Sequence, residues 1–237
     1  MTIQWEEQLL EKRQMLNKIK RYFKSSYRRQ LLEKLQNKYV SEYRGVVLDI
    51  GGRDRGAFKK PKDKVEKWIF ADIEASHKPD IVLDVANMQN IETESIDIVN
   101  AIELFEHVEK INEGINECYR ILKNNGKLII SVPFLFYIHA DPFDFQRWTL
   151  TKWKLELTKL GFEIEKAEIM GRFFTVKTGM NKTFIQSLPI IIRHLGYFLF
   201  PVFSLLNKFD NTNWIKNHPK LGNFHGGYFI IAKKLNR

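Results

Sequence analysis

The sequence is poor in cysteine, and Cys118 is the single copy in 237 residues. One cysteine excludes a disulfide within the chain and any metal site built from several thiolates. The N-terminal segment lacks the basic start and the apolar core of a secretory signal. No uncharged apolar run reaches the roughly 18 residues that a membrane-spanning helix needs. We therefore expect a cytoplasmic protein that is neither secreted nor integral to a membrane.

Acidic residues are scarce at both ends of the chain. Residues 1–45 hold 11 Lys and Arg against 5 Asp and Glu, and residues 151–237 hold 14 against 5. Residues 46–150 hold 13 against 18. A nucleic-acid-binding protein carries its basic residues around its working groove, so this distribution argues against a nucleic-acid partner. Basic flanks suit an anionic partner, such as phospholipid headgroups or a pyrophosphate-linked substrate, and a solvated basic surface explains them equally well.

Glycine and proline are absent from residues 4–38, which are rich in helix-forming residues and predict one or two leading helices. Strand-like and helical patterns then alternate, which predicts an α/β fold with a doubly wound, mostly parallel sheet. A helix over Leu150–Leu160 is expected between Thr149 as its N-cap and Gly161 as its terminator. An earlier helical pattern ends at residues 124–126. The expected strands are 46–50, 67–72, 80–85, 96–102, 127–132, 162–169 and 228–232.

The most apolar segment, residues 184–206, lies before the last expected strand and is broken by Pro189, Arg193 and Pro201. It is interpreted in three ways: as a helical lid over an acceptor pocket, as a surface that lies against a membrane, or as a segment buried against the sheet. Burial against the sheet is the simplest interpretation. We expect an N-terminal helical extension at 1–44 and one domain at 45–237, with a helical, lid-like insertion at about 180–215.

Three acidic residues follow expected strands at their carboxyl ends. The first strand delivers Asp49 and then Gly51 and Gly52 to a sharp turn, where backbone can approach a ligand closely. The next two strands end in Asp72 and Asp84, and such carboxylates can accept hydrogen bonds from ribose and attract a sulfonium or an ammonium group. A nucleotide-dependent oxidoreductase is disfavoured, because the Gly-x-Gly-x-x-Gly fingerprint of dinucleotide sites is missing.

These segments resemble the motifs of the Rossmann-like S-adenosylmethionine-dependent methyltransferases. The sequence VLDIGG at 47–52 resembles the first motif, SIDIV at 95–99 the fourth strand, LFEHV at 104–108 the "LEHV" segment and YRILKNNGK at 119–127 the "RVLKPGG" turn. The resemblance covers about residues 45–170. It implies a seven-stranded sheet with an antiparallel last strand, and S-adenosylmethionine as cofactor.

The segment 132–149, VPFLFYIHADPFDFQRWT, is similar to a branch of that family associated with bacterial surface-polysaccharide and glycolipid pathways. This resemblance implies methyl transfer to a small or lipid-linked saccharide, on an oxygen atom. A lipid-linked acceptor is compatible with peripheral contact at the inner face of the membrane.

Carried over residue by residue, the resemblance implies that the glycines line the methionine part of the cofactor, Asp72 holds the ribose and Glu103 faces the sulfonium. Arg53 stands where the family usually has a second ligand-contacting glycine, so its side chain either points to solvent or fills the pocket. A catalytically silent, methyltransferase-like binding module is therefore the alternative to an enzyme. The cofactor-binding residues implied are Asp49, Gly51, Gly52, Asp72, Asp84, Val85 and Glu103.

Polar residues also follow the fifth expected strand, at the edge where ligands bind in open α/β sheets. We predict His139 as the general base that takes the proton of an attacking hydroxyl, with Asp141 orienting or replacing it. Asp144 and Arg147 are predicted to bind the acceptor, or else to pair with each other while His139 caps a loop. His107 is interpreted as a core histidine on the helix after the fourth expected strand, with a catalytic role as the alternative. No histidines have His-x-x-x-His spacing, so no metal site is predicted.

Overall fold

A computed structural model describes residues 2–52, 58–139 and 142–236. Its seven-stranded sheet has the order β3-β2-β1-β4-β5-β7-β6, with β7 antiparallel to both of its neighbours and the other pairs parallel. The mixed α/β sheet with an antiparallel last strand is therefore confirmed. The strands are β1 Gly45–Ile50, β2 Val65–Asp72, β3 Ile81–Val82, β4 Ile96–Ile102, β5 Leu122–Pro133, β6 Phe162–Ile169 and β7 Gly227–Lys234.

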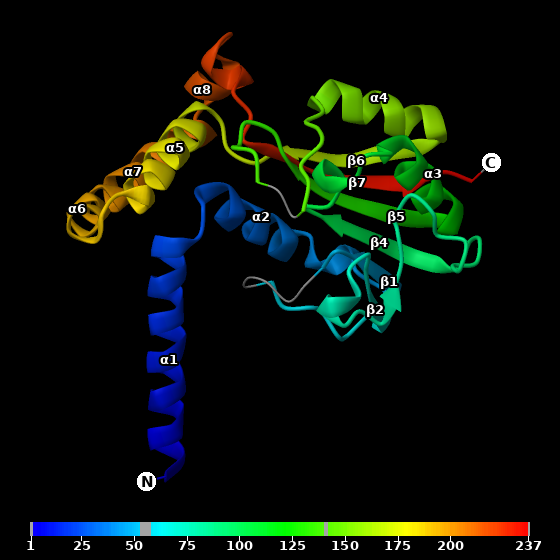
Figure 1. Ribbon diagram of the computed structural model, residues 1–237, viewed down its shortest axis with the longest axis horizontal. Coiled ribbons are helices and arrows are strands. Elements are labelled where there is room, and N and C mark those ends of the chain that lie inside the picture. The colour runs from blue at the N-terminus through cyan, green and yellow to red at the C-terminus, as the bar shows by residue number, and fades with distance from the viewer. Residues whose placement is uncertain (1, 53–57, 140–141, 237) are drawn as a thin grey trace.

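Two helices precede the sheet, as expected: α1 (Thr2–Lys24) and α2 (Tyr27–Lys38). The chain breaks between them because Ser26 has an extended backbone and its hydroxyl accepts a hydrogen bond from the amide of Arg29, at 3.1 Å, as an N-cap. Figure 1 shows that α1 projects away from the sheet whereas α2 runs along it. Only α2 therefore adds to the core of the sheet.

Helices cover both faces of the sheet (Figure 1). Alternate residues of β1 point to opposite faces: Val47 packs with Leu32 of α2, whereas Leu48 belongs to the core cluster that holds Trp153 of α4 (Leu150–Leu160). The same cluster contains Ile115 of α3 (Ile111–Ile121). Burial on both faces explains why apolar residues predominate in the central strands β1 and β4.

Two strands differ by more than two residues at one end from the sequence-based expectation, and the others agree within two residues. β5 begins at Leu122, directly after α3, because the buried Leu122 pairs with Ile96. Residues 124–126 do not end the helix; they lie inside the strand, where the pairing with β4 shifts register. β3 has two residues instead of the expected six. The α4 helix is confirmed with its N-cap Thr149 and its left-handed terminator Gly161, at φ 102°.

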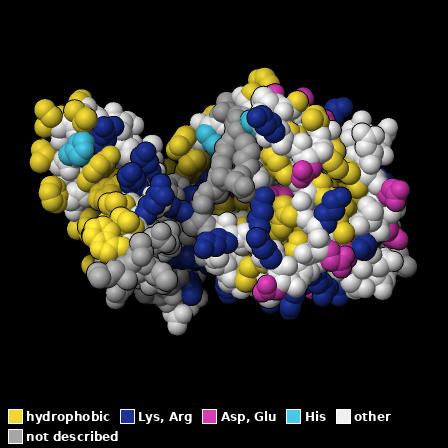
Figure 2. Space-filling view, turned by 90° about the horizontal axis from the view of Figure 1, so that it is seen from below, with side chains coloured by type: hydrophobic (Ala, Val, Ile, Leu, Met, Phe, Trp, Pro, Cys, Tyr) yellow, Lys and Arg dark blue, Asp and Glu magenta, His cyan; other side chains and the backbone are white. Residues whose placement is uncertain are grey.

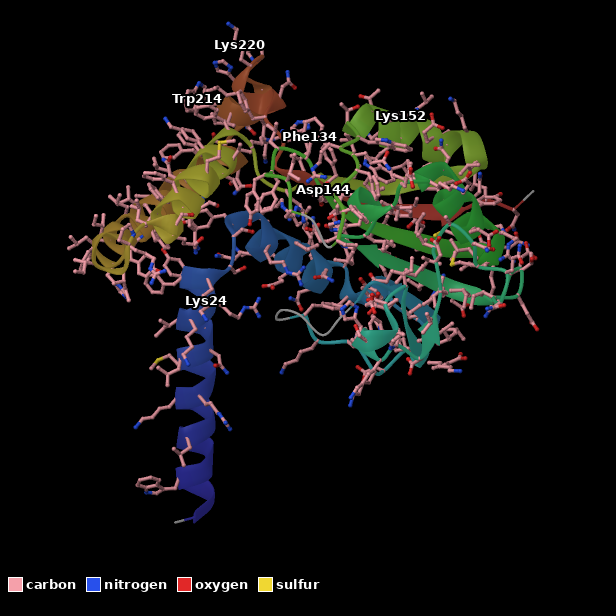
Figure 3. The ribbon with its side chains drawn as sticks, viewed as in Figure 1. Lys24, Phe134, Asp144, Lys152, Trp214 and Lys220 are labelled. Carbon is pink, nitrogen blue, oxygen red and sulfur yellow. The ribbon has the colours of Figure 1, made fainter. Side chains whose placement is uncertain are left out.

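The insertion before β7 forms a helical arm beside the sheet, which we define as residues 173–217 (Figures 1 and 3). Phe200 is fully buried in a cluster with Tyr27, and this cluster joins the arm to the junction of α1 and α2. The interpretation that this segment is buried against the sheet is therefore wrong. The arm contains α5 Phe173–Ser187, α6 Ile190–Gly196, α7 Phe200–Leu206 and α8 Asn213–Asn217.

The arm exposes apolar side chains that a core helix would bury. Ile191 is 76% exposed and Phe198 is 80% exposed. The helical run Ile190–Asn211 has 22 residues, and an 18-residue window within it has a mean hydropathy of 1.4 and is 11% buried. By length and composition this run is the one candidate for a membrane-crossing helix in the described part of the chain.

Lys182 of α5 ties the arm to the end of α1. Its ammonium group donates hydrogen bonds to the carbonyl oxygens of Tyr22, at 2.6 Å, and Ser25, at 2.8 Å. It also lies over the rings of Tyr27 and Phe200. Burial lowers the pKa of Lys182 to about 8, while the carbonyls and the ring faces stabilise its charged form.

We expect Lys182→Met to lower the free energy of unfolding by about 1.5–3 kcal/mol, because two carbonyls lose a charged donor. Denaturation in guanidinium chloride measures this change. The matched control is Lys177→Met, on an exposed position of the same helix, which should leave the midpoint within experimental error. Equal midpoints for both variants would show that water satisfies the two carbonyls.

Candidate functional site

A cavity of about 1000 Å³ opens at the carboxyl ends of β1, β2 and β4. Its size is at the upper end of the range for small-molecule sites. The N-terminal part of α2, the turn after β1 and the segment after β5 all contribute to its wall. The cavity lining includes eight residues that the sequence singled out, namely Asp49, Gly51, Gly52, Asp72, Asp84, Val85, Glu103 and His139.

The turn after β1 requires both of its glycines. Gly51 has φ +70°, a conformation that other residues rarely adopt. A Cβ on Gly52 would lie 2.0 Å from Oδ1 of Asp49. The buried carboxylate of Asp49 accepts hydrogen bonds from Asn100, at 2.6 Å, and Trp68, at 2.9 Å. Asp49 therefore anchors the turn, and the glycines leave open backbone at the cavity.

Two further acids face the cavity at strand ends. The carboxylate of Asp72 accepts hydrogen bonds from the amide of Glu74, at 2.9 Å, and meets Nδ1 of His77 at 3.0 Å. Asp84 is exposed and lies next to the buried Val85. A glycine turn and two carboxylates that line one cavity fit a ligand with an uncharged nucleoside part and a separate, positively charged group. Arg53 lies outside the described residues.

Glu103 follows β4, and its carboxylate contacts two groups. Oε2 lies 2.5 Å from Nη1 of Arg28, and Oε1 accepts a hydrogen bond from the hydroxyl of Ser131 at 2.7 Å. Burial alone would raise the pKa of Glu103, but the charge of Arg28 and the Ser131 bond outweigh it and lower the pKa. Arg28 belongs to α2, and its guanidinium lies over the ring of Phe136. The sequence gives no signal that this arginine reaches the cavity.

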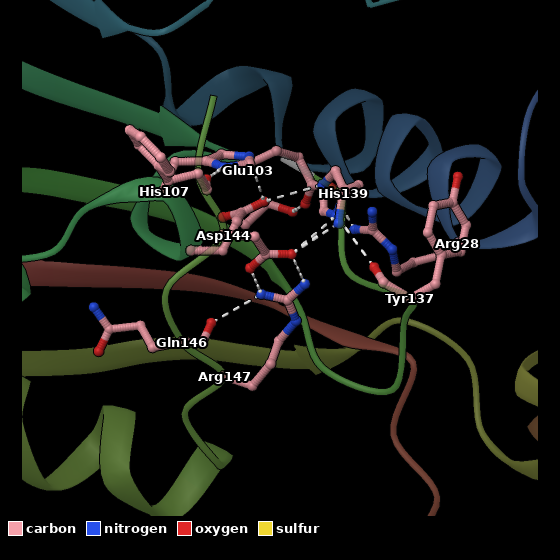
Figure 4. Close-up of polar contacts among 11 residues, drawn as sticks. Arg28, Glu103, His107, Tyr137, His139, Asp144, Gln146 and Arg147 are labelled. Carbon is pink, nitrogen blue, oxygen red and sulfur yellow. Dashed lines mark hydrogen bonds and ion pairs between the residues drawn. The ribbon is translucent and has the colours of Figure 1, made fainter. Parts of the chain in front are cut away.

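His139 lines the cavity, and Asp144 holds it in place (Figure 4). The amide of His139 donates to Oδ2 of Asp144 at 3.0 Å, and its Nδ1 lies 3.4 Å from the same oxygen. Burial lowers the pKa of His139, which favours the neutral imidazole. Asp141, the alternative base, lies outside the described residues.

Asp144 and Arg147 form a bidentate ion pair, which was the alternative to acceptor binding (Figure 4). The side chain of Asp144 is 2% exposed, and neither residue lines the cavity. The prediction that both contact the acceptor does not match this placement. Asp144 instead orients His139, and Arg147 pairs with Asp144.

His107 is a second histidine of the cavity wall, and the interpretation as a core histidine is wrong. Its Nδ1 bonds to the carbonyl oxygen of Phe143, and its ring centre lies 5.3 Å from that of His139. Glu106, which is 2% exposed, places Oε1 3.8 Å from Nε2 of His107 and 4.0 Å from Nε2 of His139. Burial and the nearby charge of Glu103 raise the pKa of Glu106 well above its usual range. Only the "LEHV" resemblance drew attention to this glutamate.

The family model of the methyltransferase domain matches residues 33–130. No curated protein matches the sequence. A SAM-dependent methyltransferase from Archaeoglobus fulgidus is 19% identical, with a TM-score of 0.55, over 91% of this chain and 98% of that chain. The [4+2]-cyclase SpnF is 15% identical, with a TM-score of 0.56, over 86% of this chain and 81% of that chain.

A third similar structure is phosphoethanolamine N-methyltransferase 2 from Haemonchus contortus, in complex with phosphomonomethylethanolamine and S-adenosylhomocysteine. It is 17% identical, with a TM-score of 0.51, over 87% of this chain and 52% of that chain. At such identities, these likenesses show a shared fold. The family match spans α2 to β5 and includes the glycine turn, Asp72, Asp84 and Glu103. The match to the methyltransferase domain model, over residues 33–130 of the 237, and the shared α/β fold support S-adenosylmethionine as the cofactor.

Proposed function

We propose that this protein methylates a hydroxyl oxygen of a sugar or of a lipid-linked glycan. The observation that carries the proposal is that two groups of residues line one cavity. The glycine turn and Asp72 suit a nucleoside, and His107 and His139 lie on another part of the same wall. When bound, S-adenosylmethionine would supply a methyl group on a sulfonium: an acceptor oxygen would form a bond to that methyl carbon while the electron pair of the carbon–sulfur bond returns to sulfur, which leaves as S-adenosylhomocysteine. Because the cofactor site and the acceptor site adjoin, they would hold the methyl group and the acceptor oxygen in a fixed relative orientation.

The chain's own residues then have distinct tasks. The glycine turn gives backbone contact, and Asp72 accepts hydrogen bonds from ribose hydroxyls. Nδ1 of His139 lies near two acceptors, the carbonyl oxygen of Tyr137 at 3.3 Å and the carboxylate of Asp144 at 3.4 Å, so we assign its proton to Nδ1. Nε2 therefore keeps a lone pair. In the protein without a bound metal ion, this nitrogen accepts the proton of the attacking hydroxyl.

The helical arm favours an acceptor that is presented by a membrane. Figure 2 shows that yellow apolar side chains gather on the lobe that the arm forms, with dark blue basic side chains beside them. Residues 173–225 contain six Lys and Arg, and Asp210 is their one acidic residue. The carboxylate of Asp210 is buried and accepts hydrogen bonds from three amides at the start of α5.

An apolar helix surface without exposed acidic groups suits an anionic bilayer interface. We propose that the arm lies on the inner face of the membrane rather than across it, because Phe200 and Phe203 are buried against Tyr27. Pro201 and Arg193 within the run also disfavour a span.

Binding of S-adenosylhomocysteine tests the proposed function. At about 100 times its dissociation constant, a ligand that binds the folded state stabilises it by about 2.7 kcal/mol, which for a chain of this size raises the melting temperature by about 5–10 °C. Differential scanning fluorimetry measures the shift, with NAD as the control ligand. No shift at millimolar S-adenosylhomocysteine would favour the catalytically silent binding module.

Asp72→Ala is expected to weaken binding of S-adenosylhomocysteine by about 1.5–3 kcal/mol, which is the value of hydrogen bonds to a charged group. Isothermal titration calorimetry measures the change. Asp80→Ala is the control, since its carboxylate bonds to the amide of Phe70 and does not line the cavity. Unchanged affinity in Asp72→Ala would place the ribose contact elsewhere, with Glu74 as the next candidate.

A further inference from the structure

We propose that Glu106, His107 and His139 form a binding site for one divalent transition-metal cation. One oxygen of Glu106, Oε1, lies 3.8 Å from Nε2 of His107 and 4.0 Å from Nε2 of His139. The ligand atoms of all three residues lie within 4.8 Å of one another. Metal–ligand bonds of about 2.0–2.2 Å would draw each side chain inward by less than roughly 1 Å.

Both histidines are held in the orientation that metal ligands need. A metal-binding histidine usually donates its second N–H to a carbonyl or a carboxylate, which fixes the ring and leaves the other nitrogen with a lone pair. Nδ1 of His107 bonds to the carbonyl oxygen of Phe143, and Nδ1 of His139 lies beside Asp144. In both rings, Nε2 is therefore the nitrogen that faces Glu106.

Glu106 itself is a buried carboxylate without a hydrogen-bond donor among the other residues that the structure describes. Both of its oxygens are buried, and neither accepts a hydrogen bond from another residue that the structure describes. A buried, unpaired carboxylate is costly, and a bound cation removes that cost.

The charged groups around the site are compatible with a bound cation. Two arginines lie near Glu106, and each is already paired: Arg28 with Glu103, and Arg147 with Asp144. Glu106 is the carboxylate of this cluster that has no arginine partner. When Glu106 is ionised, as a metal ligand must be, these two arginines and three carboxylates carry one net negative charge, which a divalent cation compensates.

The donor set indicates the kind of cation. Two imidazole nitrogens and one carboxylate suit Zn²⁺, Mn²⁺ or Fe²⁺, whereas Mg²⁺ and Ca²⁺ prefer oxygen donors alone. Three protein ligands also leave positions open, as catalytic metal sites do. His107 and His139 line the cavity, so these positions face the proposed acceptor side.

The inference rests on the proposed function, because it assigns the cation to the acceptor hydroxyl. A hydroxyl bound to the cation becomes more acidic, so that it loses its proton to water and attacks the methyl group as an oxygen nucleophile. A proton and a cation compete for the same lone pair on Nε2 of His139. With the cation bound, His139 is a ligand and no longer the base.

Calorimetry with tag-free protein tests the site, using ZnCl₂, MnCl₂ and MgCl₂ in separate titrations. We expect one Zn²⁺ or Mn²⁺ per chain and much weaker binding of Mg²⁺. Glu106→Gln and His107→Ala should each weaken Zn²⁺ binding by at least about 10-fold, and Asp144→Asn by about 10-fold through the orientation of His139. Glu113→Gln, on an exposed position of α3, is the matched control and should bind Zn²⁺ normally.

Melting curves with S-adenosylhomocysteine separate this proposal from the proposed function. If the wild type binds S-adenosylhomocysteine but takes up no Zn²⁺ or Mn²⁺, or if Glu106→Gln and His107→Ala both bind metal like the wild type, the metal site is wrong and the methyltransferase stands. If metal binds as expected and S-adenosylhomocysteine does not, the metal site stands and the proposed function is wrong. Equal melting temperatures of Glu106→Gln and wild type without ligands exclude misfolding as the cause of lost metal binding.

Discussion

His139→Ala is expected to lower the turnover of methyl transfer by about 10²–10⁴-fold, the usual effect of losing the group that handles a proton in the reaction. Its affinity for S-adenosylhomocysteine should stay near that of the wild type, because the glycine turn and Asp72 do not depend on this side chain. Single-turnover assays with radiolabelled S-adenosylmethionine measure the first quantity, and calorimetry measures the second.

The control for this experiment is His218→Ala, since His218 directly follows the arm and does not line the cavity. Turnover of the control should equal that of the wild type. If His139→Ala retains normal turnover, His139 takes no part in the chemistry and serves only to hold the loop through Asp144. A large loss in a variant of Asp141 with little change in His139→Ala would assign the base to Asp141.

The second large effect concerns the arm and its affinity for anionic bilayers. Replacement of Ile191, Leu195 and Phe198 by Glu removes three exposed apolar side chains and adds three negative charges. At roughly 1 kcal/mol for each side chain that enters the interface, partitioning onto vesicles should fall by at least about 10²-fold. Sedimentation with vesicles of phosphatidylglycerol and phosphatidylethanolamine measures the bound fraction.

The matched control replaces Val82, Leu155 and Leu235 by Glu, because these apolar residues are also exposed, at 43–53%, but lie outside the arm, in the sheet domain. We expect the control to bind vesicles nearly as well as the wild type. Equal loss in both triple variants would indicate a general charge effect, and no loss in either would remove the membrane from the proposed function.

Much of the fold follows from local sequence pattern. The helix over Leu150–Leu160 was predicted with its correct ends, because Thr149 and Gly161 act through neighbouring backbone groups. The start of β5 was missed by five residues, because the pairing of Leu122 with Ile96 determines it. Strand pairing depends on residues distant in the chain, which a local pattern does not register.

The exposure of the arm was missed for a related reason. An apolar run such as residues 184–206 shows that its side chains avoid water, but it does not show which apolar surface receives them. In the structure, Tyr27 and Ile185 bury Phe200 and Phe203, and most other apolar side chains of the run remain exposed. The partner surface is a property of the tertiary fold.

The sequence by itself determined which polar residues and glycines lie at the ends of the first strands. Asp49, Gly51, Gly52 and Asp72 line the cavity at positions that strand and turn patterns locate, because parallel strands bring their carboxyl ends to one edge. The tertiary structure decided the rest of the cavity. It places Arg28 of α2 against Glu103, and it brings His107 and His139, 32 positions apart, to the same buried glutamate. These residues meet through the packing of separate elements, and such packing leaves no periodic signal in the chain.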